Sequence, residues 1–358
     1  MTDVGAGGGP GGGPLAGRDG EAGAPRDDDR VAGRQAGAPG QDARPVVLAL
    51  RALGLGDALT GVPALRGLRR SFPGHRLVLA APAGVGGWLR DLGVVDDVVA
   101  SSGLEPVPWG HGPDVAVNLH GSGPESHRLL LGLGPGRLVA FASPEAGVDG
   151  PAWRRDEHEV DRWLRLVRSV GAECSREDLR LDVGVARRDD EAPVVLHPGA
   201  ASGSRRWPVD RWAALAAGLV ADGRRVVVTG GPQEAAIAGA VVDGLAGDRA
   251  TSTAGDLDLP GLARLVAGAA LVVCGDTGVA HVATAVGTPS VLLFGPTPPR
   301  WWGPCIDEDT HVVLWHGDPE RPGDPHGDET DPALLAVSTA EVRDAVEALL
   351  ARVAPARV

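Results

Sequence analysis

The sequence predicts an α/β protein made of two doubly wound domains that face a cleft. Three observations predict this fold class. Short apolar runs, typical of strands that are buried on both faces of a parallel sheet, alternate with helical stretches. Glycine-containing turns join several of these runs to the helix that follows. The alternation occurs in two series, separated by a polar stretch at residues 186–192 that we interpret as the interdomain linker.

Length and composition agree with two domains and add a tail. The chain has 358 residues, enough for about two domains of roughly 150 residues each. It contains 54 Gly and 30 Pro, and part of this excess lies at the start, where residues 1–43 hold only Val4, Leu15 and Val31 as sizeable aliphatic residues. Because such a segment cannot bury enough apolar surface to offset its chain entropy, we expect it to be disordered.

The first series of elements begins at Arg44, and the expected N-terminal domain spans residues 44–185. Its strands are expected at the apolar runs in residues 45–50, 76–80, 97–100 and 114–119. Its helices are expected from the turn at residues 54–57 to residue 69, and at residues 126–133 and 160–170. Strands that alternate with helices imply parallel pairing through right-handed crossovers.

The second series follows the linker, and the expected C-terminal domain spans residues 186–335. Its strands are expected at residues 194–197, 225–229, 271–274 and 290–294. Its helices are expected at residues 208–222, 232–245, 259–267 and 278–286. Doubly wound folds bind ligands beyond the carboxyl ends of their strands, so two facing domains place a ligand between them.

The end of the chain combines a polar segment with a helix. Residues 307–332 are rich in Asp, Gly, Pro and His, which is typical of a long surface loop. Ser338 and Glu341 then form an S-x-x-E capping box. The apolar positions that follow are Val342, Val346, Leu349 and Leu350. We therefore expect residues 336–358 to contain a C-terminal helix with a packing role.

Charge and cysteine usage narrow the function classes. The net charge of −13 argues against broad electrostatic binding to nucleic acid or to an anionic membrane surface. The sequence has no Lys, so any phosphate-binding cation must be Arg. Cys174, Cys274 and Cys305 are isolated, which fits small buried side chains in a reducing compartment. There is no apolar N-terminal region and no membrane-spanning run, so we expect a cytoplasmic protein without a transmembrane segment.

The first glycine turn offers a candidate for chemistry. Gly54 and Gly56 follow a strand and open a helix, as in a dinucleotide-binding fingerprint. The fingerprint then fails, because Leu59 stands at the third glycine position and no acidic residue ends the second strand. Asp57 lies in the first helical turn and is expected to face the crevice. It either stabilises the helix N-terminus, by about 0.3–1 kcal/mol, or acts as a general base.

The loop at residues 197–208 predicts a diphosphate site. It joins a strand to a helix through small residues that are followed by Arg205 and Arg206. Small residues let backbone N–H groups approach an anion, the helix N-terminus adds partial positive charge, and an Arg can hold phosphate oxygens in a bidentate way. The alternative interpretation is a solvated arginine pair on a loop.

Two further turns follow strands of the same expected sheet. One supplies acceptors and donors suited to a sugar and its phosphates, at Asp276, Thr277, Gly278 and His281. The alternative there is a helix N-cap with a core histidine. In the other turn, at residues 229–234, Glu234 either accepts ribose hydroxyls or favours the helix N-terminus. Three turns on one crevice edge indicate ligand binding more strongly than any one of them.

Other acidic residues and histidines do not predict a metal site. Asp256 and Asp258 match a short D-x-D metal-binding pattern, but two acidic residues are expected just before a helix in any case. His316 and His326 are irregularly spaced in a polar segment, which is typical of a solvated loop. We therefore expect neither a metal nor a cofactor.

Several of these segments match the motifs of one known family, in its order and spacing. They are G-D-A-L-T-G-V-P-A-L-R at residues 56–66, N-L-H-G at 118–121, V-D-R-W at 160–163, R-R-W-P at 205–208, G-G-P at 230–232, G-D-T-G-V-A-H at 275–281 and F-G-P-T at 294–297. From about Arg44 to Val353, the chain resembles the family 9 glycosyltransferases, which are the ADP-heptose:lipopolysaccharide heptosyltransferases of the cell envelope and their relatives.

The resemblance implies the GT-B fold of two Rossmann-like domains, with the acceptor bound by the first domain and the nucleotide-sugar by the second. It places Asp57 at the family's proposed general base, and Arg205 at its phosphate-binding lysine. Arginine there keeps the charge but replaces a point donor by a fork. The candidate substrate-binding residues are Gly56, Ser204, Arg205, Gly230, Gly231, Glu234, Asp276, Thr277, Gly278 and His281.

These inferences predict an inverting, metal-independent glycosyltransferase. It would move heptose or a related sugar from a nucleotide-diphosphate sugar, ADP-heptose in the resembling family, to a hydroxyl of a glycan or glycolipid acceptor at the inner membrane surface. A nucleotide-sugar epimerase of the same fold and a non-catalytic sugar-nucleotide binding protein are the alternatives.

Overall fold

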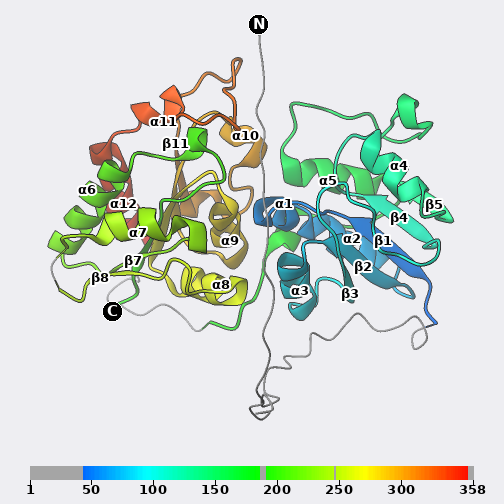
Figure 1. Cartoon of the computed structure of the whole chain (residues 1–358), viewed down its shortest axis with the longest axis horizontal. Helices are drawn as coiled ribbons and strands as arrows, with labels where there is room; N and C mark the ends of the chain where they lie inside the picture. Colours follow the sequence, from blue (N-terminus) through cyan, green and yellow to red (C-terminus); the bar gives the residue numbers. More distant parts are fainter. Residues whose placement is uncertain (1–42, 186–190, 246, 354–358) are drawn as a thin grey trace, which may run out of the picture. The chain divides into compact units, whose positions relative to one another are not determined.

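Two parallel β-sheets organise the part of the chain that the computed structural model describes, residues 43–185, 191–245 and 247–353 (Figure 1). We call the part built on the first sheet the N-terminal lobe and the part built on the second sheet the C-terminal lobe. The disorder expected for residues 1–43 concerns residues outside the described ranges, apart from Ala43. Most of the expected linker, up to residue 190, also lies outside them.

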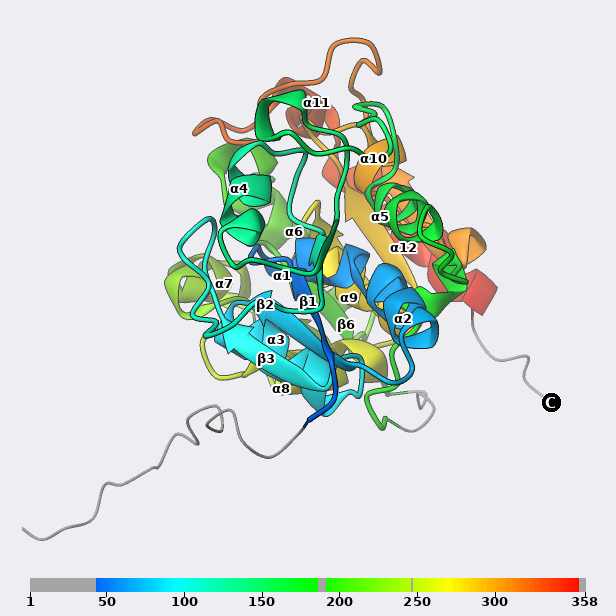
Figure 2. The ribbon, with the colours of Figure 1, turned by 90° about the vertical axis from the view of Figure 1, so that its right-hand side faces the viewer.

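The N-terminal lobe contains a sheet in the order β3-β2-β1-β4-β5. Its strands are β1 (Val46–Leu50), β2 (Arg76–Ala81), β3 (Asp97–Ala100), β4 (Val115–Asn118) and β5 (Arg137–Val139). Its helices are α1 (Leu55–Thr60), α2 (Val62–Ser71), α3 (Ala83–Asp91), α4 (Glu125–Leu131) and α5 (Glu159–Arg168). Figure 2 shows α2 beside α5, which it contacts. The expected strand positions are confirmed. Strands β1, β2 and β4 are buried on both faces, whereas edge strand β3 is partly exposed.

The C-terminal lobe contains a sheet in the order β11-β10-β9-β6-β7-β8. Its strands are β6 (Val194–His197), β7 (Val226–Val228), β8 (Ala250–Ser252), β9 (Leu271–Gly275), β10 (Ser290–Leu293) and β11 (His311–Leu314). Its helices are α6 (Val209–Ala221), α7 (Ala235–Val242), α8 (Leu259–Gly268), α9 (Gly278–Val286), α10 (Pro299–Trp302), α11 (Pro332–Ala336) and α12 (Thr339–Val353). All strand pairs in both sheets are parallel.

Each sheet reverses its strand order beside its first strand. The reversal lies between β1 and β4 in the N-terminal lobe, and between β6 and β9 in the C-terminal lobe. Ligands of doubly wound folds bind in the crevice at this switch point, outside the carboxyl ends of the strands. The turns that follow β1, β6 and β9 carry the candidate residues, so the topology brings the predicted sites to the appropriate sheet edges.

The structure departs from the expected elements in several places. The helix expected up to Arg69 is divided at Gly61 into α1 and α2. Helix α3 was not expected, because Gly84, Gly86 and Gly87 lower helix propensity. Strands β5 and β8, each three residues long, were also not predicted. The surface-loop prediction for residues 307–332 is wrong at His311–Leu314, which pair with β10 as edge strand β11.

The C-terminal helix α12 packs as expected. Its four apolar positions, Val342, Val346, Leu349 and Leu350, are buried in the core of the C-terminal lobe. At its start, the Glu341 backbone N–H donates to Ser338 Oγ at 3.2 Å, which is one half of the predicted capping box. The Glu341 carboxylate contacts His316 instead of completing the box.

Truncation of Val346 should test how much α12 contributes to stability. Val346→Ala removes two buried methyl groups and should lower the free energy of unfolding by about 2 kcal/mol. The control is Leu335→Ala, at a side chain that is 42% exposed, and it should change stability by less than about 0.5 kcal/mol. Urea unfolding measures both variants. Equal effects would contradict the packing role of α12.

Candidate active site

Asp57 lies in the first turn of α1, directly beyond the carboxyl end of β1. Gly54 precedes the helix in extended conformation, so the chain turns from strand to helix within a few residues. The Asp57 side chain is 32% exposed. Burial raises the pKa of the Asp57 carboxyl, the nearby Arg51 guanidinium lowers it, and the Glu159 carboxylate raises it again. The net effect is a pKa above the usual range for Asp.

Arg51 is a buried cation that sequence reasoning missed. It is 1% exposed and stands just after β1. Its Nε donates to the Asp57 carbonyl oxygen, and its Nη1 donates to the Leu119 carbonyl oxygen beyond β4. Its Nη2 donates to Thr60 Oγ1 at 2.9 Å. The available signal was a charged residue at the end of an otherwise apolar strand.

Glu159 supplies the closest carboxylate to Arg51. It begins α5, and its Oε1 accepts from Arg51 Nη2 at 3.1 Å and from Trp163 Nε1 at 2.8 Å. Arg162 Nε lies 3.4 Å from Glu159 Oε2. By contrast, 3.6 Å separates Arg51 Nη2 from Asp57 Oδ1. The buried arginine is therefore hydrogen-bonded to one carboxylate and only near the other.

Two helix N-termini from different lobes meet beside Asp57. A Cβ added at Gly56 in α1 would lie 2.7 Å from His281 Cδ2, and one added at Gly278 in α9 would lie 2.9 Å from Leu55 Cβ. Contacts this short leave no space for a side chain. Glycine at both positions therefore allows α1 and α9 to approach closely, a packing role that the sequence analysis did not assign to Gly56 and Gly278.

An alanine at position 56 should strain this helix contact. Gly56→Ala should lower the free energy of unfolding by about 2 kcal/mol, because the added methyl group overlaps the His281 ring. Gly54→Ala is the matched control, since its Cβ would meet only Asp57 Oδ2 at an ordinary 3.6 Å. Thermal unfolding of the two variants side by side checks the difference. A Gly56→Ala variant as stable as the control would rule out the close approach.

Asp276 lies at the corresponding turn of the C-terminal lobe, after β9. Burial raises the pKa of its carboxyl to about 6, while Arg205 and a hydrogen bond with Thr297 lower it. Asp57 adds a like charge that raises it further. The two acidic residues predicted from separate motifs are thus electrostatically coupled. Thr277 caps α9 in extended conformation, and its Oγ1 is buried without a hydrogen-bond partner among the described residues.

The charge of Arg205 acts on both carboxyl groups. Its Nη1 donates to the Asp276 carbonyl oxygen at 3.2 Å, and its Nε donates to Ser202 Oγ at 3.2 Å. Its charge lowers the pKa of both Asp57 and Asp276. Arg206 is held in a similar way, with its Nε and Nη2 donating to the Ala200 carbonyl oxygen, and both arginines are partly buried.

Ser204 is buried beneath a later loop. Its backbone N–H donates to the Gly327 carbonyl oxygen at 2.9 Å, and its carbonyl oxygen accepts from the Asp331 N–H at 3.1 Å. A Cβ added at Gly203 would lie 1.6 Å from the Asp328 carbonyl oxygen. The backbone N–H of Ser204 is therefore already paired within the protein, unlike the open cradle that the sequence suggested.

Glu234 joins the turns that follow β6 and β7. Its Oε2 accepts from the Gly231 backbone N–H at 2.7 Å. A Cβ added at Gly199 would lie 1.9 Å from Glu234 Oε1, and one at Gly230 would lie 3.0 Å from Glu234 Cβ. These glycines make room for the carboxylate. Glu234 therefore caps its own helix N-terminus and also lies beside the loop at residues 197–208.

His281 is packed between groups from both lobes. Burial lowers the pKa of its imidazole to about 4, and the charges of His158 and Arg51 act in the same direction. The ring is therefore neutral at pH 7. It also makes an edge contact with the Trp302 ring, with centroids 5.9 Å apart.

Two of the remaining candidates have structural partners. Asp258 caps α8 by accepting from the Gly261 N–H at 2.7 Å. His316 Nε2 lies 3.0 Å from the Glu341 carboxylate.

The cysteines are free thiols; Cys274 and Cys305 are buried as expected, whereas Cys174 is only half-buried. Among the described residues, no group of three or more His, Cys, Asp or Glu side chains is placed to hold a metal ion. No helix in the described ranges is both long and apolar enough to cross a bilayer.

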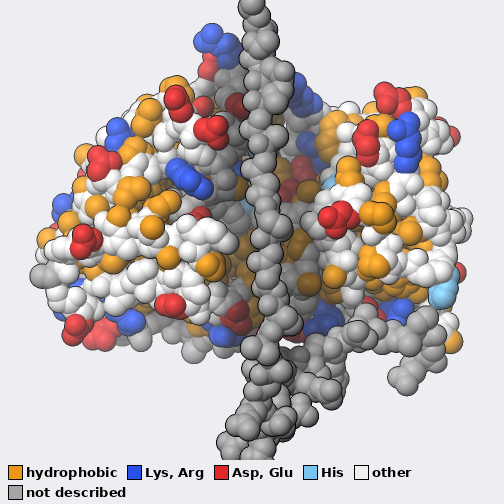
Figure 3. Space-filling view, viewed as in Figure 1, with side chains coloured by type: hydrophobic (Ala, Val, Ile, Leu, Met, Phe, Trp, Pro, Cys, Tyr) orange, Lys and Arg blue, Asp and Glu red, His pale blue; other side chains and the backbone are white. Residues whose placement is uncertain are grey.

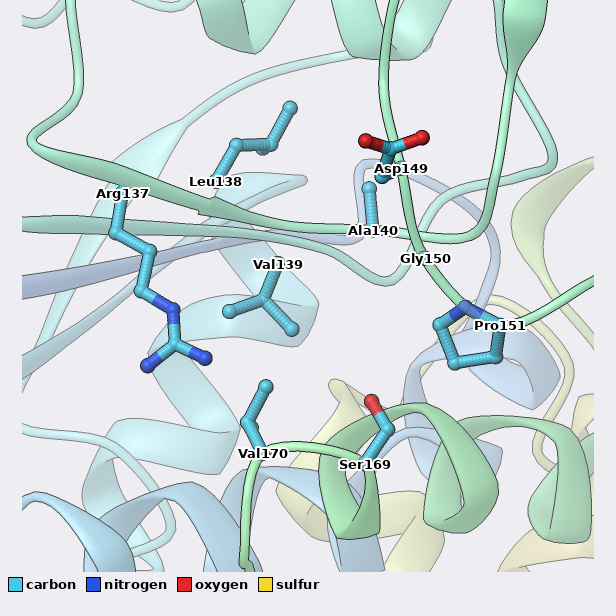
Figure 4. A pocket seen from close by; sticks show the side chains of 9 residues that line it. All are labelled: Arg137, Leu138, Val139, Ala140, Asp149, Gly150, Pro151, Ser169 and Val170. Carbon is cyan, nitrogen blue, oxygen red and sulfur yellow. The ribbon is translucent and has the colours of Figure 1, made fainter.

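Two cavities in the described part of the chain have linings that include neither Asp57 nor Asp276. One cavity of about 420 Å³ runs along β5 and the end of α5, lined by residues that include Arg137, Asp149 and Ser169 (Figure 4). Another, of about 260 Å³, lies beyond β10 and β11 and includes Trp315 and Asp331. On the face in Figure 3, acidic and basic side chains are interspersed instead of gathered into one basic patch.

Comparison with known proteins shows a similarity to one family. Residues 152–322 match the profile of Glycosyltransferase family 9 (heptosyltransferase), a span that includes Arg205, Glu234 and Asp276 but not Asp57. Lipopolysaccharide heptosyltransferase 3 of Escherichia coli is 32% identical over 160 residues, which cover 44% of this chain and 46% of that protein. The chain thus spans about half the length of the curated relatives it matches.

Solved structures extend the similarity to both lobes. A glycosyl transferase family 9 protein from Veillonella parvula aligns with a TM-score of 0.71 at 20% identity, covering 88% of this chain and all of that one. The E. coli ADP-heptose LPS heptosyltransferase II aligns with a TM-score of 0.69 at 19% identity, covering 86% and 98%. The predicted fold of two Rossmann-like domains, GT-B, is confirmed. The match to the glycosyltransferase family 9 profile spans residues 152–322, and over both lobes the chain shares the fold of the solved structures that resemble it.

Proposed function

We propose that this chain is an inverting, metal-independent glycosyltransferase that moves heptose or a related sugar from a nucleotide-diphosphate sugar to an acceptor hydroxyl. One observation carries the proposal: Asp57 of the N-terminal lobe and Asp276 of the C-terminal lobe are coupled to each other and to the same cation, Arg205. Displacement at an anomeric carbon needs a base for the acceptor hydroxyl and a cation for the departing diphosphate. A carboxylate of raised pKa and a nearby arginine can fill these two roles.

Asp57 takes the role of the general base. Its ionised carboxylate accepts the proton of an acceptor hydroxyl while the hydroxyl oxygen forms a bond to the anomeric carbon. The bond from that carbon to the diphosphate oxygen breaks on the opposite face, so the configuration inverts in one displacement. Burial raises the pKa of Asp57, and a stronger base removes the proton more readily.

Arg205 stabilises the departing diphosphate. Its guanidinium is held through Ser202 and the Asp276 carbonyl oxygen, so the charge is oriented before the leaving group develops its own. The first turn of α9, which begins at Gly278, adds the partial positive charge of a helix N-terminus. These groups provide the electrostatic stabilisation of the leaving group from the chain's own residues.

The proposed substrates are those named for the proteins that the chain resembles. The solved relative named as an ADP-heptose LPS heptosyltransferase supports ADP-heptose as the donor, and the curated relatives support a lipopolysaccharide-type glycolipid acceptor. We place the donor on the C-terminal lobe, where the Arg205, Glu234 and Asp276 turns lie, and the acceptor on the N-terminal lobe. The reaction would then take place on the cytoplasmic side of the inner membrane surface.

A screen of nucleotide sugars tests the proposal. A ligand that binds only the folded state raises the melting temperature, so ADP-heptose should raise it more than GDP-, UDP- or dTDP-sugars do. Transfer should require an acceptor and persist at full rate in EDTA. Conversion of the donor alone would identify an epimerase, and tight binding without turnover on any acceptor extract would identify a binding protein. Loss of transfer in EDTA, restored by a divalent metal, would overturn metal independence.

A further inference from the structure

We propose that Arg51 and Glu159 are positioning residues that fix the orientation of Asp57 and set its strength as a base. The inference rests on the proposed function, in which Asp57 is the base. Neither residue belongs to the predicted site. Both are buried, and they come from elements that are far apart in the sequence, the end of β1 and the start of α5.

The hydrogen bonds of Arg51 hold the backbone of Asp57 while leaving its carboxylate available. Arg51 Nε donates to the Asp57 carbonyl oxygen, and Nη2 donates to Thr60 Oγ1, which in turn donates to the same carbonyl oxygen at 2.8 Å. The turn that carries Asp57 is thus bound from two sides. The carboxylate itself makes no direct hydrogen bond to Arg51, because 3.6 Å separates Oδ1 from Nη2.

Glu159 competes with Asp57 for the same guanidinium group. Its Oε1 lies 3.1 Å from Arg51 Nη2, closer than the Asp57 carboxylate does. A base that formed the closer ion pair with Arg51 would be held in its ionised form and would bind a proton weakly. By taking that position, Glu159 offsets part of the effect of the arginine charge and leaves Asp57 the stronger base. Trp163 Nε1 orients the Glu159 carboxylate at 2.8 Å.

The other charges around Asp57 come from the C-terminal lobe. Arg205 lies after β6 and lowers the pKa of Asp57, whereas Asp276, after β9, is a like charge. His281 in α9 is neutral at pH 7, with its pKa lowered to about 4. These groups contact the donor in the proposed function. Arg51 and Glu159 therefore act on the pKa of Asp57 without contacting the sugar donor.

Opposite shifts in two variants form the test. Glu159→Gln keeps the side-chain shape but removes the competing charge, so the pKa of Asp57 should fall by about one pH unit. Arg51→Met removes the cation and should raise the pKa of Asp57 by a similar amount. Asp161→Asn is the matched control, since Asp161 lies on the same helix but pairs with Arg176, and it should cause no shift.

Two readouts separate this inference from the proposed function. The pKa of Asp57 is measured by carbon-13 NMR titration of labelled Asp carboxyl groups in the full chain, with its signal assigned by loss in Asp57→Asn. The acidic limb of the kcat profile against pH should move in the same directions. A merely structural pair would lower the melting temperature without opposite shifts, so unmoved or equally directed pKa values would overturn the inference.

A second variant guards against poor folding. Glu159→Gln leaves Arg162 Nε facing an amide, so Glu159→Gln combined with Arg162→Met removes both members of that ion pair. This double variant should show the same downward shift as the single one, and absence of the shift in a folded double variant would overturn the inference. If the pKa values move as expected but Asp57→Asn retains full turnover, the base assignment fails while the role of the pair stands.

Discussion

Asp57→Asn should reduce sugar transfer by at least about a thousand-fold while leaving the donor-induced rise in melting temperature unchanged. The amide has nearly the shape of the carboxylate but cannot accept a proton from the acceptor hydroxyl. The backbone contacts that hold the turn, from Arg51 to the Asp57 carbonyl oxygen, do not involve the carboxylate. The variant should therefore fold and bind donor normally, and the loss should appear in kcat.

The matched control is an exposed carboxylate of the same lobe. Asp91→Asn alters a side chain that pairs only with its neighbour Arg90 at the surface, so its transfer rate should equal that of the unmodified chain. The variant Asp57→Asn has a further signature, a lower pKa for Asp276, because a neighbouring negative charge is gone. Turnover within tenfold of the unmodified chain would remove Asp57 as the base.

Arg205→Met should weaken donor binding by about 100-fold, equivalent to about 2.7 kcal/mol. The substitution keeps an apolar stem of similar length but removes the charge that we propose contacts the diphosphate. Because Arg205 also lowers the pKa of Asp57 and Asp276, the acidic limb of the activity profile should move to higher pH. Isothermal titration with the donor nucleotide and a kcat profile against pH measure the two effects.

The variant Arg205→Lys tests whether a positive charge at this position is enough for donor binding. Arg205→Lys should retain donor binding to within about tenfold, since a point charge still reaches the phosphate oxygens. Arg224→Met, at an exposed position beyond α6, serves as the control for loss of an arginine and should bind donor normally. Equal affinity of the Met and Lys variants would contradict a charge contact between Arg205 and the diphosphate.

The sequence was most informative about buried strands and least informative about sheet edges. The expected strands at β1, β2, β6 and β9 were confirmed because continuous apolar runs are needed where both faces of a sheet are covered. Edge strands need less apolar surface, so β5, β8 and β11 carry little pattern, and β11 lies in a segment whose composition predicts a loop. Their pairing depends on neighbouring strands that are distant in the sequence.

The candidate site was predictable where a motif follows a strand, and not where partners come from elsewhere. Asp57, Arg205 and Asp276 were identified from their turns, and the structure brings them within mutual electrostatic reach. Ser204 was predicted as a contact, but a loop more than a hundred residues later pairs with its N–H. Glu159 was missed because an acidic residue at a helix start has an ordinary explanation in the helix dipole.

The absence of Lys from this chain has different consequences at its two key cations. At position 205 the proposed contact is to a diphosphate, where an ammonium group would still supply the charge but not the two parallel donors of a guanidinium group. Arg51 instead distributes separate donors to α1, to the residue after β4 and to α5. An ammonium group presents its donors from a single atom and cannot span these three directions. A lysine could therefore supply the charge of Arg205, whereas it could not make the separate contacts of Arg51.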